Sequence, residues 1–326
     1  MVSTKFYLSI DWGTTNFRMR LVNYISLKIM DEVSFENGGA RHLFDSWRKE
    51  GGSRKLAFIN FLKQQITRLK IKIPPGTPVI ISGMASSSIG VLELPYATLP
   101  FDINGKNAIV RSLNFKELPG LPVFLISGIK SEYDVMRGEE TQLLGCIKEN
   151  EHKKGEQLFI FPGTHSKHII VKDTQVINFR TYMTGEFFEL LAKKSLLSSS
   201  VNSVTKISTA KIKQSFEMGV KASINGNLLN KAFHVRTNQL FKKINTSENN
   251  YYLSGLLIGT ELRELVSNTY EQVTIVSGSH LLNFYQLAFK ILGISGNQQK
   301  ISSVVSDKLV ARGQYQILKN NLKLKW

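Results

Sequence analysis

The residues that most suggest chemistry lie near the N-terminus, in the sequence Asp-Trp-Gly-Thr-Thr-Asn at residues 11–16. They follow an apolar run at residues 6–10 that is typical of a buried strand. An acidic residue at the end of such a strand needs a partner, and a hydrated divalent cation is a natural one. Glycine lets backbone N–H groups approach a phosphate, and threonine hydroxyls add donors. An ordinary hairpin turn explains the same residues, so this segment alone decides nothing.

A second turn of similar chemistry lies at residues 162–166, with the sequence Pro-Gly-Thr-His-Ser. It offers the same backbone and hydroxyl donors without the acid, and His165 and Lys167 could face a phosphate or a carboxylate. A lone histidine is more often a surface or core residue. Two phosphate-suited turns change that balance, because a nucleoside triphosphate bound between two lobes needs contacts from both.

A third group of interest is Arg-Gly-Glu-Glu-Thr-Gln-Leu-Leu-Gly at residues 137–145. Adjacent carboxylates after a glycine are predicted to begin an apolar helix, at the positive end of its dipole. One carboxylate could accept a proton from a substrate hydroxyl, while Arg137 could hold an anionic group. Acidic residues are also common in the first turn of a helix, where they merely stabilise it.

Both glycine–threonine turns stand at the same place in a repeated pattern. Each follows one strand-like run and precedes two more, which predicts that each half of the chain opens with a three-stranded antiparallel meander. The predicted strands are residues 6–10, 17–22 and 28–35, and then 157–161, 167–171 and 176–180. The glycine–threonine turn at the same place in both patterns is better evidence that the two halves of the chain are duplicates than the strand pattern alone.

The remaining patterns alternate helices with short buried strands, which is typical of an α/β protein. Apolar runs at residues 79–81, 123–126 and 273–276 each end at a Ser-Gly pair and predict inner strands of a parallel sheet. Predicted helices cover residues 54–70, 186–197, 214–224, 228–241, 251–267 and 281–292. A polar stretch at residues 151–156 predicts a boundary between an N-terminal lobe, residues 1–150, and a C-terminal lobe, residues 151–326.

Composition indicates a globular protein of a reducing compartment. The 326 residues are 42% hydrophobic, and the single cysteine, Cys146, cannot form an internal disulfide. The net charge of +17 would suit nucleic acid, an anionic membrane or small anions, but the basic residues are dispersed. Residues 1–5 lack the features of a secretory signal, and no apolar run approaches the roughly 20 residues that span a bilayer. We therefore expect a soluble cytoplasmic protein without nucleic-acid or membrane partners.

Four segments together resemble the signatures of the 2-dehydro-3-deoxygalactonokinase family. They are residues 11–16, 137–145, 162–167 and 179–186, and residues 254–261 continue the match. Their order and spacing agree over nearly the whole chain. That family belongs to the superfamily of actin, hexokinase and Hsp70. The resemblance therefore implies a two-lobed actin-like ATPase fold, an α/β architecture of duplicated ribonuclease H-like domains with mixed sheets flanked by helices.

The resemblance also implies roles for individual residues. Those expected to contact ATP are Asp11, Gly13, Thr14, Thr15, Gly163, Thr164, His165, Ser166, Ser277, Gly278 and Ser279, the last three beside the adenosine. Asp11 is expected to hold Mg²⁺ through water, so ATP and Mg²⁺ are the implied cofactors. Glu139 stands where related sugar kinases carry a catalytic acid, and a one-residue gap keeps Glu140 as an alternative. Those expected near the substrate are Arg18, Ser82, Gly83, Met84, Arg137, Lys167 and Arg180.

The implied reaction is transfer of the γ-phosphoryl group of ATP to the terminal hydroxyl of 2-dehydro-3-deoxy-D-galactonate. It requires the two glycine–threonine turns to face each other across a cleft and hold one phosphate chain. The alternatives are a kinase of the gluconate epimer, a phosphatase or NTP hydrolase on the same fold, and a non-enzymatic regulator or nucleic-acid binder. No segment resembles a DNA-reading motif, which disfavours the last. The epimer and the oligomeric state, for which a homodimer is one candidate, are left open.

Overall fold

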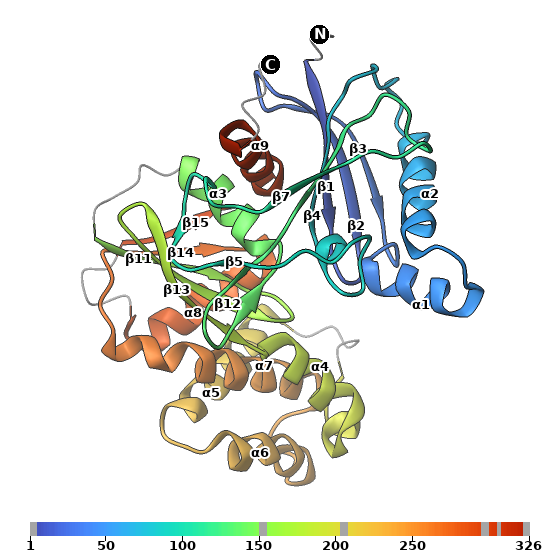
Figure 1. The fold of residues 1–326 in the computed structure, drawn as a ribbon. Coiled ribbons are helices and arrows are strands. Elements are labelled where there is room, and N and C mark those ends of the chain that lie inside the picture. The colour runs from blue at the N-terminus through green and yellow to red at the C-terminus, as the bar shows by residue number, and fades with distance from the viewer. Residues whose placement is uncertain (1–4, 150–154, 203–207, 295–299, 305–307, 322–326) are drawn as a thin grey trace. The chain divides into compact units, whose positions relative to one another are not determined.

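The computed structural model describes residues 5–149, 155–202, 208–294, 300–304 and 308–321 (Figure 1). The chain divides into two compact units. The first contains Met1–His152, Lys172–Asn178 and Ser306–Trp326, and the second contains Lys153–Val171 and Phe179–Val305. A single boundary at residue 150 does not reproduce this division, because the chain returns to the first unit twice. The predicted boundary segment, residues 151–156, lies largely outside the described residues.

The first unit is built on a six-stranded mixed sheet with the strand order β3-β2-β1-β4-β8-β7. β1, β2 and β3 form an antiparallel meander, β4 and β8 continue parallel to β1, and β7 closes the sheet antiparallel to β8. The strands are β1 (Phe6–Trp12), β2 (Phe17–Asn23), β3 (Ile29–Phe35), β4 (Val79–Gly83), β7 (Val110–Leu113) and β8 (Val123–Ile126). The predicted meander and parallel inner strands are confirmed.

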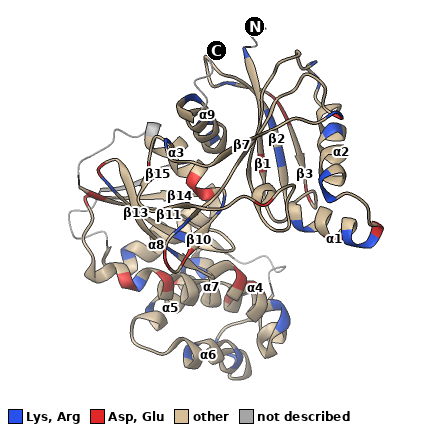
Figure 2. Cartoon of the chain, in the orientation of Figure 1, with Lys and Arg blue, Asp and Glu red and all other residues tan. Residues whose placement is uncertain are grey.

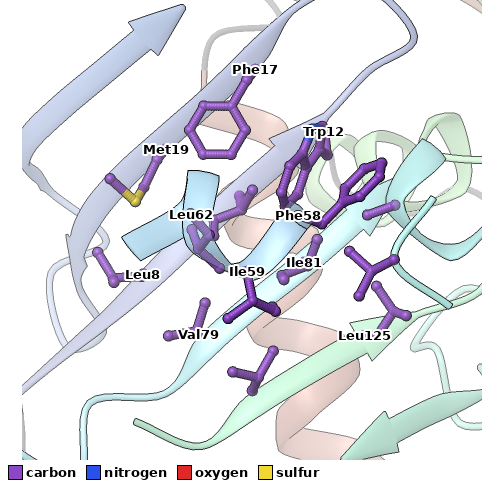
Figure 3. Packing of buried hydrophobic residues seen from close by; sticks show 14 of the residues in the cluster. Leu8, Trp12, Phe17, Met19, Phe58, Ile59, Leu62, Val79, Ile81 and Leu125 are labelled. Carbon is purple, nitrogen blue, oxygen red and sulfur yellow. The ribbon is translucent and has the colours of Figure 1, made fainter. Parts of the chain in front are cut away.

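Helices cover both faces of this sheet. On one face, α1 (Ala40–Glu50) and α2 (Arg54–Ile66) enclose a core of β-strand side chains with Phe58, Ile59 and Leu62 of α2 (Figure 3). On the other face lies α9 (Leu309–Asn321), which packs against α3 (Glu139–Glu149). Successive side chains of β1 point to opposite faces of the sheet, so each face has its own helices. Leu8 faces the core under α1 and α2, whereas the Tyr7 hydroxyl donates to the Ala311 carbonyl of α9 at 2.9 Å.

Short elements connect the inner strands of the first unit. The 3₁₀ turn η1 (Met84–Ser86) follows β4 directly. A three-stranded sheet with the order β10-β9-β5 consists of β5 (Ala97–Thr98), β9 (Ile129–Lys130) and β10 (Val135–Met136). A further short strand, β6 (Phe101–Asp102), pairs antiparallel with the first residues of β13, and these residues belong to the same unit.

The second sheet has the strand order β15-β14-β11-β12-β13-β6. β14 is parallel to both β11 and β15, whereas β11, β12 and β13 are consecutive neighbours joined by tight turns. The strands are β11 (Glu156–Phe161), β12 (Ser166–Lys172), β13 (Gln175–Tyr182), β14 (Gln272–Val276) and β15 (Lys300–Val304). Neighbouring strands joined by so few residues run antiparallel, so the second unit repeats the meander of the first.

The second unit is richer in helix. Its helical elements are α4 (Thr184–Lys194), η2 (Leu196–Ser200), α5 (Thr209–Ile224), α6 (Leu228–Leu240), α7 (Thr246–Leu262), η3 (Arg263–Ser267) and α8 (Ser279–Ile291). α5 and α7 touch backbone to backbone, because a Cβ on Gly219 would lie 2.0 Å from the Tyr252 carbonyl oxygen. α7 then separates two apolar cores, one against β11 and β14 and one against α6.

The predicted helices and strands are present with ends shifted by a few residues. α1, α9 and the short strands were not predicted from the sequence. Lys and Arg residues are dispersed over helices and strands of both units, as expected (Figure 2). Among the described residues, no helix has the length and apolar content needed to cross a bilayer.

Candidate active site

The first glycine–threonine turn joins β1 to β2 and is exposed to solvent. It is closed by a hydrogen bond from the Gly13 N–H to the Asn16 carbonyl, at 2.9 Å. The N–H groups at the start of α1, residues 39–41, donate to the carbonyls of Gly13, Thr14 and Thr15 at 2.8 to 3.1 Å. The helix therefore fixes the backbone of the turn, while the threonine side chains remain accessible to a ligand.

Asp11 immediately precedes this turn and pairs in the sheet with Arg18 of β2 and Ser82 of β4. Its Oδ2 lies 4.0 Å from Arg18 Nη1, and its side chain is 22% exposed. Burial raises the pKa of Asp11, and the positive charges of Arg18 and Arg20 oppose this effect. A half-buried carboxylate with so long a contact to its nearest cation can accept a second cation.

The donor set around Asp11 fits Mg²⁺ bound together with a nucleotide. Mg²⁺ is usually held by one or two carboxylates and by substrate phosphates, and it keeps several waters. In the part of the chain that the structure describes, no three His, Cys, Asp or Glu side chains gather as a metal site. A single acid beside a phosphate turn suits a metal that arrives with its phosphates.

Glu139 and Glu140 begin α3, and their environments differ. Glu140 is buried, with Oε2 accepting from the Gly138 N–H at 2.7 Å and Oε1 from the Thr141 hydroxyl at 2.9 Å. Burial, reinforced by the charge of Glu139, raises the pKa of Glu140 to about 7. Glu139 is half-buried and accepts from the Arg137 N–H at 3.2 Å. Glu139 is therefore the more accessible carboxylate, whereas Glu140 shapes the start of the helix.

Two glycines bring the start of α3 to the end of β4. Gly83 ends β4 with φ of 87°, and a Cβ there would lie 2.6 Å from the Trp12 carbonyl oxygen. Gly138 has φ of 116°, and a Cβ on it would lie 3.5 Å from the Gly83 Cα. Both backbone conformations favour glycine. The predicted catalytic acids thus lie beside the predicted substrate segment, residues 82–84.

Arg137, predicted to bind substrate, is engaged by the protein itself. Its Nη1 donates to the carbonyl and to the hydroxyl of Ser86, both at 2.6 Å. Its guanidinium carbon lies 4.1 Å from the centre of the Tyr96 ring, within the range of a cation–π contact. These contacts show Arg137 ordering the segment after β4. By contrast, the Arg18 side chain is 51% exposed and can reach a ligand.

The C-terminal helix also contributes to this region of the first unit. Gln314 of α9 is buried, and its Nε2 donates to the Ile10 carbonyl at 2.8 Å and to the Ser82 hydroxyl at 2.9 Å. Ile10 precedes Asp11, and Ser82 is the sheet partner of Asp11. Gln314 therefore holds together the ends of the two strands that carry the predicted site.

The second glycine–threonine turn joins β11 to β12 and is likewise exposed. The Glu186 N–H, in the first turn of α4, donates to the Thr164 carbonyl at 3.0 Å, and the Glu186 carboxylate pairs with His165 Nε2. Gly185 packs so closely that a Cβ on it would lie 2.6 Å from the Gly163 carbonyl oxygen. The start of α4 thus fixes this turn as the start of α1 fixes the first. Ser166, the last predicted ATP contact here, is buried instead.

A largely apolar pocket of about 380 Å³ lies beside this second turn, entirely within the second unit. Its walls come from α4, α7 and α8, with Gly163 and Thr164 at its edge. The aromatic side chains among its lining residues are Phe188, Tyr251, His280, Phe284 and Tyr285. The volume is within the range of small-ligand sites, and flat aromatic walls suit a purine ring.

Other predicted residues of the second unit lie near this pocket or apart from it. Ser277 ends β14 and is buried, and Gly278 caps α8, whose next residues, His280 and Leu281, line the pocket. The Ser279 side chain is outside the described part. Lys167 is buried, with Nζ donating to the Thr181 hydroxyl at 2.6 Å. Arg180 pairs with Glu264 at 3.0 Å and lines a separate cavity of about 60 Å³.

Several residues that shape the candidate sites of the two units were not predicted from the sequence. They are Gly39, Tyr251, Phe284 and Gln314. The adjacent glycines at residues 38–39 are a signal that could have located the close contact with the first turn. The pocket aromatics and the glutamine carry no such signal, because only tertiary packing brings them to the site.

Comparison with known proteins finds relatives that match nearly the whole chain. The family model described as 2-keto-3-deoxy-galactonokinase matches residues 11–317. The 2-dehydro-3-deoxygalactonokinase of Escherichia coli (strain K12) is 29% identical in an alignment of 306 residues that covers 88% of this chain and 90% of that protein. A Rhizobium meliloti (strain 1021) protein named "Probable 2-dehydro-3-deoxygalactonokinase DgoK1" is 28% identical in an alignment of 322 residues that covers 96% of each chain.

The fold has a counterpart among solved structures. A crystal structure of a Sinorhizobium meliloti protein, described as a candidate 2-dehydro-3-deoxygalactonokinase, superposes with a TM-score of 0.78 over 98% of both chains, at 24% identity. The predicted α/β architecture, with mixed sheets flanked by helices, is confirmed, and this fold is shared with the Sinorhizobium meliloti structure. Because the family model spans nearly all of the described residues, this chain belongs to the 2-keto-3-deoxy-galactonokinase family, a family of carbohydrate kinases.

Proposed function

We propose that this chain transfers the γ-phosphoryl group of ATP to the terminal hydroxyl of 2-dehydro-3-deoxy-D-galactonate, giving the 6-phosphate and ADP. The match of the family model to residues 11–317 is the observation that carries this proposal. It is supported by full-length relatives that bear the name of this activity. The exposed turns and the start of α3 supply the residue types that the reaction needs.

ATP is held by its base and by its phosphates in this proposal. The adenosine occupies the 380 Å³ pocket between α4, α7 and α8, where Tyr251, His280 and Phe284 offer aromatic surfaces. The phosphates receive hydrogen bonds from the two glycine–threonine turns, at residues 13–15 and 163–165. Each turn is fixed by the start of a helix, so little reorganisation is needed when the phosphates bind. That the two turns hold one nucleotide together stays a prediction.

Glu139 is the general base of the proposed reaction. It accepts the proton of the terminal hydroxyl as that oxygen bonds to the γ-phosphorus and the bond to the ADP oxygen breaks. Its carboxylate is half-buried at the start of α3, where the helix dipole stabilises the anion. Glu140 is a positioning residue, because both of its oxygens are engaged by the turn and helix that carry Glu139.

Mg²⁺ is the metal that the Asp11 carboxylate would hold, through water and in company with the phosphates. It would neutralise charge that develops on the transferred group. Arg18, beside Asp11, remains the candidate for the substrate carboxylate, since its side chain reaches solvent. Ser82, Gly83 and Met84 lie next to the predicted base and are the proposed walls of the sugar-acid site.

A coupled assay of ADP release tests the proposal. The purified chain is given ATP and Mg²⁺ with 2-dehydro-3-deoxygalactonate, its gluconate epimer or common hexoses. Rapid ADP release that depends on 2-dehydro-3-deoxygalactonate supports the proposal. A preference for the gluconate epimer would identify that epimer as the substrate instead. Phosphate release without any sugar acid would indicate a hydrolase.

A cytoplasmic location and a homodimer stay predictions, which cell fractionation and light scattering can test.

A further inference from the structure

Glu261 of α7 is a buried carboxylate with four hydrogen-bond partners from three other elements. Its Oε1 accepts from the Ser166 hydroxyl at 2.7 Å and lies 2.8 Å from His168 Nε2. Its Oε2 accepts from the Thr184 hydroxyl at 2.5 Å and from the Tyr285 hydroxyl at 2.8 Å. The Glu261 side chain is 1% exposed and that of His168 is 4% exposed, so the carboxylate and the imidazole are buried, whereas Thr184 lies at the edge of the pocket.

The number of donors matches the capacity of one ionised carboxylate. A carboxylate presents about four lone-pair sites and no donor, and here each oxygen receives two contacts. The imidazole of His168 must then carry a hydrogen on Nε2. Hydrogen bonds to an ionised acceptor are stronger than those between neutral groups. An amide in place of the carboxylate would offer one acceptor oxygen, so two donors would lose their partner.

Three of the four donors belong to the proposed nucleotide site. Ser166 ends the second glycine–threonine turn, Thr184 begins α4, and Tyr285 lines the pocket from α8. Thr184 stands directly before Gly185, the residue that packs against Gly163. Glu261 therefore connects the turn with two of the helices that wall the pocket, although it does not itself line that pocket.

We propose that Glu261 is a positioning residue that fixes the second turn for the phosphates of a nucleotide. Its carboxylate accepts hydrogen bonds from Ser166, at the end of the turn, and from Thr184, at the start of α4. Because Gly185 of α4 packs against Gly163, the exposed residues 163–165 of the turn are held in one conformation. The ligand class that depends on Glu261 is then nucleoside di- and triphosphates, and not the nucleoside alone. This inference rests on the proposed function for the identity of the ligand.

Calorimetric titration of the purified chain with ADP and with adenosine, in the presence of Mg²⁺, tests the role of Glu261. We expect Glu261→Gln to raise the Kd for ADP at least about tenfold, because two buried donors lose their acceptor. The Kd for adenosine is expected to stay within about twofold, because Glu261 does not itself line the pocket. In steady-state assays the KM for ATP should rise about tenfold and the KM for the sugar acid should not.

Glu264→Gln is the matched control. Its carboxylate lies just beyond the end of α7 and is 52% exposed, pairing with Arg180 and Tyr182. Both Kd values should remain within about twofold of the unsubstituted protein. A second variant, Thr184→Val, keeps the shape of the side chain but removes one donor to Glu261. We expect its Kd for ADP to rise about threefold and its Kd for adenosine to rise less, although Thr184 also lines the pocket.

Two results would overturn the inference. One is a Glu261→Gln protein that binds ADP as tightly as the unsubstituted chain, and the other is an equal loss of ADP and adenosine, which a general loosening produces. If Glu261→Gln does not fold, an unchanged Kd for ADP in Thr184→Val would overturn the inference instead. Failure of the proposed function is a separate outcome, namely a chain that binds ADP through Glu261 but phosphorylates no sugar acid.

Discussion

A Cβ on Gly39 would lie 2.3 Å from the carbonyl oxygen of Thr14, so α1 can approach the first turn this closely because residue 39 is glycine. The second unit repeats the relationship: a Cβ on Gly185 would lie 2.6 Å from the carbonyl oxygen of Gly163. In each unit the helix that follows the meander closes on the exposed turn through a glycine. The duplication thus extends beyond the strands to the contact that makes each turn rigid.

Gly39→Ala and Gly185→Ala should therefore impair nucleotide use. The added methyl group meets backbone atoms that belong to the turn, so the helix or the turn must shift. We expect kcat/KM for ATP to fall at least about tenfold in each variant, with a loss of about 1 to 3 kcal/mol in the free energy of unfolding. Steady-state kinetics and urea denaturation measure the two effects.

Gly226→Ala is the control for these substitutions. A Cβ at Gly226 meets only the flexible side chain of Lys231 among its three nearest atoms, and that side chain can move aside. Its kcat/KM should stay within about twofold of the unsubstituted chain. Normal kinetics in both Gly39→Ala and Gly185→Ala would show that the close contacts do not govern the turns.

Of the two adjacent carboxylates at the start of α3, Glu139 should be the one on which kcat depends as a general base. We expect Glu139→Gln to lower kcat by about 10²- to 10⁴-fold, the usual contribution of a general base, with little change in either KM. Glu93→Gln, an exposed acid of the same unit, should leave kcat within about twofold. A Glu139→Gln protein with near-normal turnover would exclude Glu139 as the base and leave Glu140 as the candidate.

Much of the fold follows from local sequence patterns. The first meander is predictable because polar and apolar residues alternate and because Gly13 and the threonines mark a turn. β4 and β8 are predictable as inner strands because continuous apolar runs are typical of strands buried on both faces. The exposed turns were found by the same reasoning, since their chemistry is local.

Contacts between distant segments were not predictable in this way. α3 ends at residue 149 and α9 begins at residue 309, yet the two helices pack together. Gln314 reaches the end of β1 through that packing, and no periodicity reveals which strand a buried glutamine will contact. The predicted boundary at residue 150 misassigned α9 for the same reason.

Gln314 supports a third prediction, because its amide satisfies two polar groups at the ends of β1 and β4. Gln314→Ala leaves the buried Ile10 carbonyl without this donor, which should cost about 1 to 3 kcal/mol of unfolding free energy. We also expect kcat to fall about tenfold, since Asp11 and Ser82 are the last residues but one of β1 and β4, where Gln314 binds. Urea denaturation and steady-state kinetics provide the measurements.

Lys319→Ala is the control for Gln314→Ala, because Lys319 is exposed in the last turn of the same helix. Its stability should change by less than about 0.5 kcal/mol and its kcat by less than about twofold. Should Gln314→Ala lose stability without any loss of kcat, the glutamine supports the fold but does not position the site.

Glu140 gives the chain a pH-dependent stability of predictable sign. Its pKa is raised from 4.5 to about 7, so the folded state binds this proton more tightly than the unfolded state does. The contribution is fully present below pH 4.5 and is lost as the pH rises through 7, by about 3 kcal/mol. Glu140→Gln should flatten the unfolding free energy across this range, and Glu93→Gln should not. An unchanged slope in Glu140→Gln, measured by urea denaturation at each pH, would contradict the assignment.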